Sequence, residues 1–280
     1  MSQSTPPPDL PASLRDALRD AAWEVVEIGM SGAQVCRVMT PGQPPRYLKF
    51  ASGAHVRELR AERDRLQWLQ SRLPVPAVCG WAEAGDDGPA DADERDERAR
   101  GWLLLSEAPG RMACDAAFMG DPQRVVELLA AGLRRLHSLD IAACPFDARL
   151  DYRLAQAAWV IRAGIADVEA VRHDLGVSAE ELLARLIATR PDEPTADLVF
   201  THGDYCLPNI LLDADCSRVS AYLDWGRAGV ADRYQDLSIG ARSVRHNLGD
   251  EWGERFLAAY GLVPLDRARL DWYETLDELF

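Results

Sequence analysis

Lysine is almost missing from this sequence, although basic residues are common in it. Of 31 basic residues only Lys49 is a lysine, and all the others are arginine. A single ammonium group in a chain of this composition calls for a chemical explanation. We therefore expect Lys49 to have a specific role in a functional site.

Long apolar runs and paired cysteines are also lacking. No stretch approaches the roughly eighteen apolar residues of a membrane-spanning helix, and no charged-then-apolar signal opens the chain. The six cysteines are scattered without any C-x-x-C pair, which argues against a zinc site and against a disulfide framework. We expect a soluble, cytoplasmic protein that has no membrane partner.

A basic excess is missing too. The sequence has 45 acidic and 31 basic residues, which gives a formal net charge of −14. Nucleic-acid binding needs a basic face, so this charge argues against a nucleic-acid partner and is compatible with a cationic ligand. A solvated acidic surface remains the simpler reading of most of these charges.

The first hundred residues predict a small antiparallel sheet and one long helix. Residues 56–69 carry apolar side chains at helical spacing, with Glu62 on or beside the inward face. A polar segment at residues 86–97 reads as a hairpin loop. Short β-branched and apolar runs predict five strands, at residues 23–28, 34–40, 46–51, 77–84 and 102–108.

Beyond Pro109-Gly110 the pattern becomes mainly helical. Asp121 followed by Pro122 predicts the cap and the first residue of a helix that runs to His137. Ser178 begins a capping box that opens another helix. The 280 residues favour two lobes or one large domain. We expect a mobile tail at residues 1–11, an N-terminal lobe at 12–105, a hinge at 106–110 and a C-terminal lobe at 111–280.

The most informative segment is Thr-His-Gly-Asp-Tyr-Cys-Leu-Pro-Asn at residues 201–209. Asp204 and Asn209 share one predicted loop, and Asp224 follows the short strand predicted at residues 219–223. Phosphoryl transfer needs a group that orients the attacking hydroxyl and oxygen ligands for magnesium ions, and these three residues supply both. A lone aspartate near a turn is usually a cap or a solvated carboxylate, but the full spacing favours the catalytic reading.

These residues resemble the kinase signature of the aminoglycoside phosphotransferase family. In that family H-G-D-x-x-x-x-N is the catalytic loop, and a later Asp replaces the aspartate of the protein-kinase D-F-G motif. The resemblance implies an α+β, two-lobed, protein-kinase-like fold with a small antiparallel-sheet N-lobe that binds the nucleotide and a mostly helical, catalytic C-lobe. It further implies that ATP and Mg²⁺ are used, that Asp204 orients or deprotonates the acceptor hydroxyl, and that Asn209 and Asp224 bind the metal. His202 is expected to be structural.

The N-terminal lobe contains the other parts that such a site needs. Small residues around Ser31 would let backbone N–H groups approach phosphate oxygens, although any hairpin turn can look like this. Tyr47 and Lys49 alternate along one predicted strand, so a ring can cover adenine while the ammonium reaches the α- and β-phosphates. Glu62 is placed to pair with Lys49, and a helix-surface glutamate is the competing reading. The resemblance also implies backbone contacts to adenine from Ser106 and Ala108.

Three features narrow the resemblance to the aminoglycoside 3′-phosphotransferases. Residues 224–237 look like the D-x-G-R-x-G-x-A-D-x-x-x-D-[LI] block of that subfamily. Residues 136–146 contain its L-H-S-L-D and C-P-F segments. The chain ends in Leu-Asp-Glu-Leu-Phe, similar to a C-terminus that contacts the ammonium groups of the drug. The resemblance implies substrate contacts by Arg227, Arg242, Asp277, Glu278 and Phe280.

Physical chemistry is consistent with such a substrate. An aminoglycoside is a flexible polycation, and carboxylates both attract it and fix which hydroxyl meets the γ-phosphate. An acidic last turn opposes the helix dipole, so Asp277 and Glu278 are slightly costly without a cationic partner. Surface salt bridges are the competing reading for Arg227 and Arg242. Residues 246–247, His-Asn, depart from the acidic residues that the subfamily pattern leads us to expect.

The sequence thus predicts an ATP-dependent enzyme that phosphorylates the 3′-hydroxyl of kanamycin-like antibiotics and so gives antibiotic resistance. A kinase of another hydroxyl substrate, such as choline, a macrolide or a metabolite, is the alternative, and the acidic C-terminus argues against it. A nucleotide-binding pseudokinase is disfavoured because every expected nucleotide-site residue is present. We expect a monomer or a weak dimer.

Overall fold

The computed structural model describes residues 10–26, 33–85, 98–165, 171 and 175–280. The chain divides into two compact units, Met1–Pro109 (unit 1) and Gly110–Phe280 (unit 2). Most of the expected tail, the polar segment at 86–97 and Ser31 lie outside the described residues. Among the helices that the structure describes, none has the length and apolar character needed to cross a membrane.

Unit 1 is built on a five-stranded antiparallel sheet with the strand order β1-β2-β3-β5-β4. The five predicted strands are confirmed, and a short helix, α1, precedes the first of them. The elements are α1 (Ala12–Ala17), β1 (Ala22–Val26), β2 (Gln34–Met39), β3 (Arg46–Ser52), the 3₁₀ turn η1 (Gly53–His55), α2 (Val56–Leu69), β4 (Val78–Ala84) and β5 (Arg100–Ser106).

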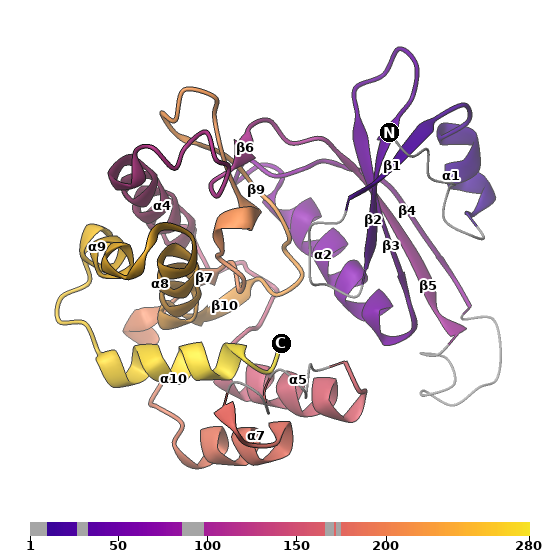
Figure 1. The fold of residues 1–280 in the computed structure, drawn as a ribbon. Coiled ribbons are helices and arrows are strands. Elements are labelled where there is room, and N and C mark those ends of the chain that lie inside the picture. The colour runs from indigo at the N-terminus through magenta and orange to yellow at the C-terminus, as the bar shows by residue number, and fades with distance from the viewer. Residues whose placement is uncertain (1–9, 27–32, 86–97, 166–170, 172–174) are drawn as a thin grey trace. The chain divides into compact units, whose positions relative to one another are not determined.

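The two faces of this sheet are covered by different helices (Figure 1). Leu14 and Leu18, at α1, pack with Leu48 and Leu104 in one buried cluster. Because neighbouring residues of a strand point to opposite faces, Tyr47 and Lys49 of β3 lie on the other face, where α2 packs. The sheet therefore keeps Lys49 off the α1 core and next to α2.

Unit 2 is mainly helical, as predicted. The caps at Asp121 and Ser178 are confirmed, since their side chains accept hydrogen bonds from the N–H groups of Arg124 and Glu181 at 3.1 Å. Its elements are β6 (Arg111–Met112), α4 (Pro122–His137), α5 (Leu150–Arg162), α7 (Ala179–Ala188), η2 (Thr195–Asp197), β7 (Leu198–Thr201), η3 (Leu207–Asn209), β8 (Ile210–Leu212), β9 (Val219–Tyr222), β10 (Gly229–Asp232), α8 (Tyr234–Leu248), α9 (Asp250–Tyr260) and α10 (Arg267–Asp277).

Two small antiparallel sheets position the loops of unit 2. β10 pairs with β7, and β6, β8 and β9 form the other sheet in the order β6-β8-β9. The strands β6 and β10 were not predicted. α8 packs against α9 and α10, and α4 packs against α9 (Figure 1).

Candidate active site

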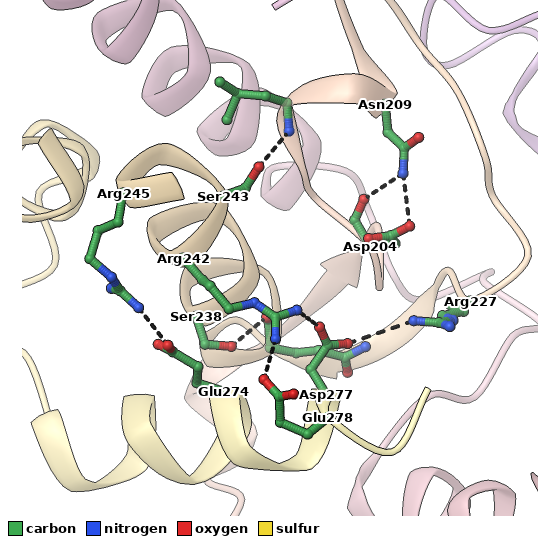
Figure 2. Close-up of polar contacts among 12 residues, drawn as sticks. Asp204, Asn209, Arg227, Ser238, Arg242, Ser243, Arg245, Glu274, Asp277 and Glu278 are labelled. Carbon is green, nitrogen blue, oxygen red and sulfur yellow. Dashed lines mark hydrogen bonds and ion pairs between the residues drawn. The ribbon is translucent and has the colours of Figure 1, made fainter. Parts of the chain in front are cut away.

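The loop between β7 and β8 brings Asp204 and Asn209 into direct contact. Asn209 Nδ2 donates hydrogen bonds to Asp204 Oδ2 at 2.8 Å and to the Asp204 main-chain oxygen at 3.1 Å (Figure 2). Since the amide nitrogen makes both bonds, Asn209 Oδ1 faces away from Asp204, and it accepts no hydrogen bond from any described residue. The amide thus orients the carboxylate and keeps its own oxygen available.

The backbone just before Asp204 is held by a buried carboxylate of α8. The N–H groups of His202 and Gly203 donate to the two oxygens of Asp236 at 2.7 and 2.8 Å. Gly203 has a φ of +81°, and a Cβ there would collide with the main chain of Arg227. Asp236 was not among the predicted site residues, although its place as the last aspartate of the D-x-x-x-D block was a signal that could have identified it.

The His202 ring is packed against an aromatic side chain in the protein interior. It is fully buried, and its centroid lies 4.4 Å from the Trp225 ring. Burial lowers the pKa of His202, so the ring stays neutral near pH 7. This packing agrees with the expected structural role of His202.

Asp224 lies at the end of β9, beside the Asn209 loop. The N–H of Leu223 donates to the main-chain oxygen of Asn209 at 2.8 Å, which joins the two segments. Asp224 has a φ of +59°, a left-handed conformation that costs a non-glycine residue about 1 kcal/mol or more and that Asp tolerates better than most. Unit 2 therefore brings the predicted segments at 204, 209 and 224 together.

The donor chemistry of this cluster fits magnesium. Mg²⁺ is usually held by one or two carboxylates, amide or water oxygens, and the phosphates of its substrate. Among the described residues no group of three or more His, Cys, Asp or Glu side chains forms a metal cage. The residues present match a metal site that is completed by a nucleotide rather than by protein ligands alone.

In unit 1, Lys49 and Glu62 form the predicted ion pair. Lys49 Nζ lies 2.7 Å from Glu62 Oε1 and 2.8 Å from Oε2. The exposed fraction of the side chain is 15% for Lys49 and 5% for Glu62. Glu62 is therefore an inward residue of α2 and not the surface glutamate of the competing reading.

The other predicted nucleotide contacts lie along the same strands. The Tyr47 hydroxyl is 3.5 Å from Glu107 Oε1. The N–H of Ser106 donates to the Ala77 oxygen at 2.9 Å, so this N–H is already used. The N–H of Ala108 donates to no group of the described residues. Within this segment, the N–H of Ala108 can therefore donate a hydrogen bond to a ligand.

The predicted drug-binding carboxylates are already paired with arginines of their own unit. Arg242 of α8 binds Asp277, and its other terminal nitrogen lies 2.6 Å from Glu278 Oε1 (Figure 2). Arg227 lies 3.6 Å from Asp277 Oδ1. The acidic last turn of α10 thus has cationic partners within the chain. The unfavourable interaction of these carboxylates with the helix dipole is therefore no evidence for a cationic substrate.

Burial distinguishes the two carboxylates. Asp277 is 8% exposed, whereas the side chain of Glu278 is 30% exposed. Burial raises the pKa of Asp277, and the neighbouring Arg227 and Arg242 oppose that rise. Asp277 is therefore set in the protein interior, and Glu278 is the more accessible carboxylate.

Comparison with known proteins decides the family. The sequence model of the phosphotransferase enzyme family matches residues 23–273. The chain belongs to this family. It is 36% identical to the aminoglycoside 3′-phosphotransferase of Niallia circulans over 96% of this chain and 97% of that protein. It is 37% identical to the streptomycin 3″-kinase of Streptomyces griseus over 92% of each.

Solved structures give the same assignment for this phosphotransferase. The crystal structure of an aminoglycoside-3′-phosphotransferase of type VIII matches with a TM-score of 0.81 and 36% identity, over 96% of this chain and 97% of that one. The aminoglycoside phosphotransferase APH(3″)-Id from Streptomyces rimosus matches with a TM-score of 0.76 and 35% identity, over 95% of each. The suspected family, the α+β protein-kinase-like fold and the phosphotransferase class are confirmed.

Arg153 is a residue of this phosphotransferase that sequence reasoning missed. It lies on α5, is 2% exposed, and its guanidinium carbon stands 3.9 Å from the centroid of the Phe280 ring. The Arg227 guanidinium is 5.2 Å from the same ring. Burial, followed by the charge of Arg227, lowers the pKa of Arg153 to about 10. No motif marks Arg153, because its surroundings come from segments remote in sequence.

Proposed function

We propose that this phosphotransferase moves the γ-phosphate of ATP to the 3′-hydroxyl of kanamycin-like aminoglycosides and so inactivates them. The observation that carries the proposal is the Asp204–Asn209 contact next to Asp224. Relatives that match over nearly the whole chain bear the name aminoglycoside 3′-phosphotransferase, in Niallia circulans and in Streptomyces fradiae. A related structure contains ADP and streptomycin, which supports nucleotide binding.

Asp204 is the proposed catalytic residue. Its carboxylate, oriented by Asn209 Nδ2, accepts a hydrogen bond from the attacking hydroxyl. It takes up the proton as the new P–O bond forms and the bond from the γ-phosphorus to the β–γ bridging oxygen breaks, with ADP as the leaving group. Asn209 Oδ1 and the Asp224 carboxylate are the proposed magnesium ligands. When bound, Mg²⁺ neutralises the charge on the β- and γ-phosphates.

Unit 1 supplies the proposed nucleotide contacts. Lys49, held by both oxygens of Glu62, contacts the α- and β-phosphates. Tyr47 covers adenine, and the backbone at Ser106 and Ala108 binds its edge. Ser31 is retained as a proposed phosphate-loop residue.

The proposed substrate contacts lie around the end of α10. Glu278 is the leading contact for a drug ammonium because its side chain is accessible, while the buried Asp277 acts mainly by fixing Arg227 and Arg242. The Phe280 ring, packed against Arg227, gives this region an apolar wall. We propose that the enzyme works as a monomer or a weak dimer in the cytoplasm, without a nucleic-acid partner.

Streptomycin is the second candidate acceptor. The relative named streptomycin 3″-kinase is 37% identical, a value close to the 36% of the 3′-phosphotransferases. Both candidates use the same catalytic loop and differ in which hydroxyl is presented to Asp204.

The test is a coupled ADP-release assay with kanamycin, streptomycin and choline as acceptors, followed by NMR location of the added phosphate. We expect ADP release that depends on kanamycin and a product phosphorylated at the 3′ position. Release with streptomycin alone would replace the first candidate by the second. Release with choline alone, or with none of the three, would refute an aminoglycoside substrate. Asp204→Ala is the control for a contaminating kinase.

A further inference from the structure

A chain of buried polar side chains leads from α9 to the catalytic loop. The Tyr260 hydroxyl lies 2.8 Å from His137 Nδ1, and His137 Nε2 lies 3.0 Å from Asp236 Oδ2. Asp236 in turn accepts hydrogen bonds from the N–H groups of His202 and Gly203. Asp236 is fully buried, and His137 and Tyr260 are 9% and 7% exposed. The phosphotransfer mechanism described above leaves His137 and Tyr260 without a role.

The hydrogen-bonding roles of Tyr260, His137 and Asp236 indicate where the protons lie in this network. His137 Nε2 faces a carboxylate oxygen, which accepts hydrogen bonds, so a ring proton on Nε2 makes this contact. With the proton on Nε2, Nδ1 accepts a hydrogen bond from the Tyr260 hydroxyl. Burial raises the pKa of Tyr260, so the hydroxyl keeps the proton that it donates. Asp236 thus selects the ring tautomer, and Tyr260 holds the ring in that orientation.

The hydrogen bonds of Asp236 restrict the rotation of its carboxylate. Asp236 Oδ2 is shared by the His202 N–H at 2.7 Å and the His137 ring at 3.0 Å, so His137 limits how the carboxylate can rotate. A Cβ on Gly203 would collide with the main chain of Arg227, so the backbone is closely packed at this point. We therefore expect a rotation of Asp236 to shift the two peptide groups that carry the N–H of His202 and of Gly203. A misplacement of about 1 Å can cost about 100-fold in rate when a reacting group must be aligned.

We propose that His137 is a positioning residue for phosphoryl transfer, which holds Asp236 and through it the backbone that presents Asp204, with Tyr260 holding the imidazole ring in place through Nδ1. The effect on rate rests on the proposed function. The effect on the backbone does not, and it can be measured without any substrate.

Two substitutions distinguish the roles of the two ring nitrogens of His137. Glutamine places its amide nitrogen as many bonds from Cα as His137 Nε2, so His137→Gln can still donate to Asp236. Asparagine reaches only the position of Nδ1, so His137→Asn removes that donor. Ser138→Ala is the matched control, because Ser138 is the next residue and, among the described residues, its hydroxyl donates to the Arg135 oxygen alone.

The first measurement is amide hydrogen exchange in residues 201–206 of the full-length protein. We expect His137→Asn to speed exchange at residues 202 and 203 roughly tenfold, the amount expected for one weakened hydrogen bond, while His137→Gln and Ser138→Ala stay near the wild type. Equal exchange in the asparagine and glutamine variants would overturn the proposal.

The second measurement is kcat per folded molecule with the active aminoglycoside. We expect His137→Asn to lose about 10- to 100-fold in kcat with an ATP KM within about twofold of wild type, and His137→Gln to keep most of its kcat. A purely structural His137 would lower the melting temperature of both variants and leave their kcat values per folded molecule equal, which contradicts the proposal.

Tyr260→Phe keeps the proposal testable if His137→Asn fails to fold, because it deletes one oxygen and keeps the ring. Faster exchange at residues 202 and 203 is expected, and unchanged exchange would overturn the part that Tyr260 has in holding the ring. Absence of drug-dependent turnover in the wild type would refute the proposed function, whereas the exchange results decide the role of His137 alone.

Discussion

Removal of the Arg242 charge tests how the buried Asp277 is stabilised. Arg242→Met deletes the guanidinium but keeps an apolar stem of similar length. In the wild type Arg242 contacts Asp277 directly, Arg227 lies 3.6 Å from it, and the charge of Arg153 adds a weaker attraction. The variant loses the direct contact, so the carboxylate becomes a buried charge with weaker compensation.

The expected loss in the free energy of unfolding follows from the burial of Asp277 and Arg242. Breaking a fully buried ion pair by removing one partner costs about 3–5 kcal/mol. The side chain of Arg242 is 36% exposed, so solvent screens part of the interaction and we expect a loss of about 2 kcal/mol. For a domain of this size that corresponds to a fall in melting temperature of about 4–8 °C.

The pH dependence gives the sharper test. Burial already raises the pKa of Asp277, and the loss of Arg242 raises it further because a charge that opposes the rise is gone. A carboxylate whose folded pKa lies above its unfolded value destabilises the folded state when ionised, so this loss is present at high pH and disappears as pH falls toward the unfolded value. The deficit of Arg242→Met should therefore shrink between pH 7.5 and pH 4.5.

The assay is urea unfolding of wild type and Arg242→Met at both pH values, with Asp277→Asn and the double variant completing the cycle. The double variant should recover most of the stability that Arg242→Met loses at pH 7.5, because the buried Asp277 charge is gone. An equal deficit at both pH values, or no recovery in the double variant, would refute an Asp277 charge that Arg242 compensates.

Four further results are expected. Asp204→Ala should lower kcat by about 10²–10⁴ with ATP affinity kept, as measured by turnover and nucleotide titration, and near-normal turnover would exclude the catalytic role. Glu62→Gln should raise the ATP KM about tenfold through a weaker hold on Lys49, and an unchanged KM would count against that contact. Glu278→Gln should raise the KM of the drug and not that of ATP in the same assay. Gly203→Ala should lower both the melting temperature and kcat, because its Cβ collides with the main chain of Arg227; wild-type values would contradict the tight packing of this loop.

Several features could be predicted because they depend on neighbours in the chain. The caps at Asp121 and Ser178 each bond an N–H three residues later, so composition and spacing suffice to find them. The period of β3 and α2 placed Lys49 and Glu62 on facing sides, and the pair is formed. The spacing of the H-G-D motif likewise placed Asp204 and Asn209 on one loop, where their side chains are in direct contact.

Other features were decided only by the path of the chain in space. Asp236 meets His202 and Gly203 across a separation of more than thirty residues, and no local pattern shows which oxygen binds which N–H. The same holds for Arg242, which compensates the acidic end of α10. The sequence by itself determined the elements, the family signature and the chemistry of the loop, because these are written in short spacings. Tertiary structure decided which charges are buried, paired and held in place, because desolvation and partner choice depend on contacts between segments that are far apart in the chain.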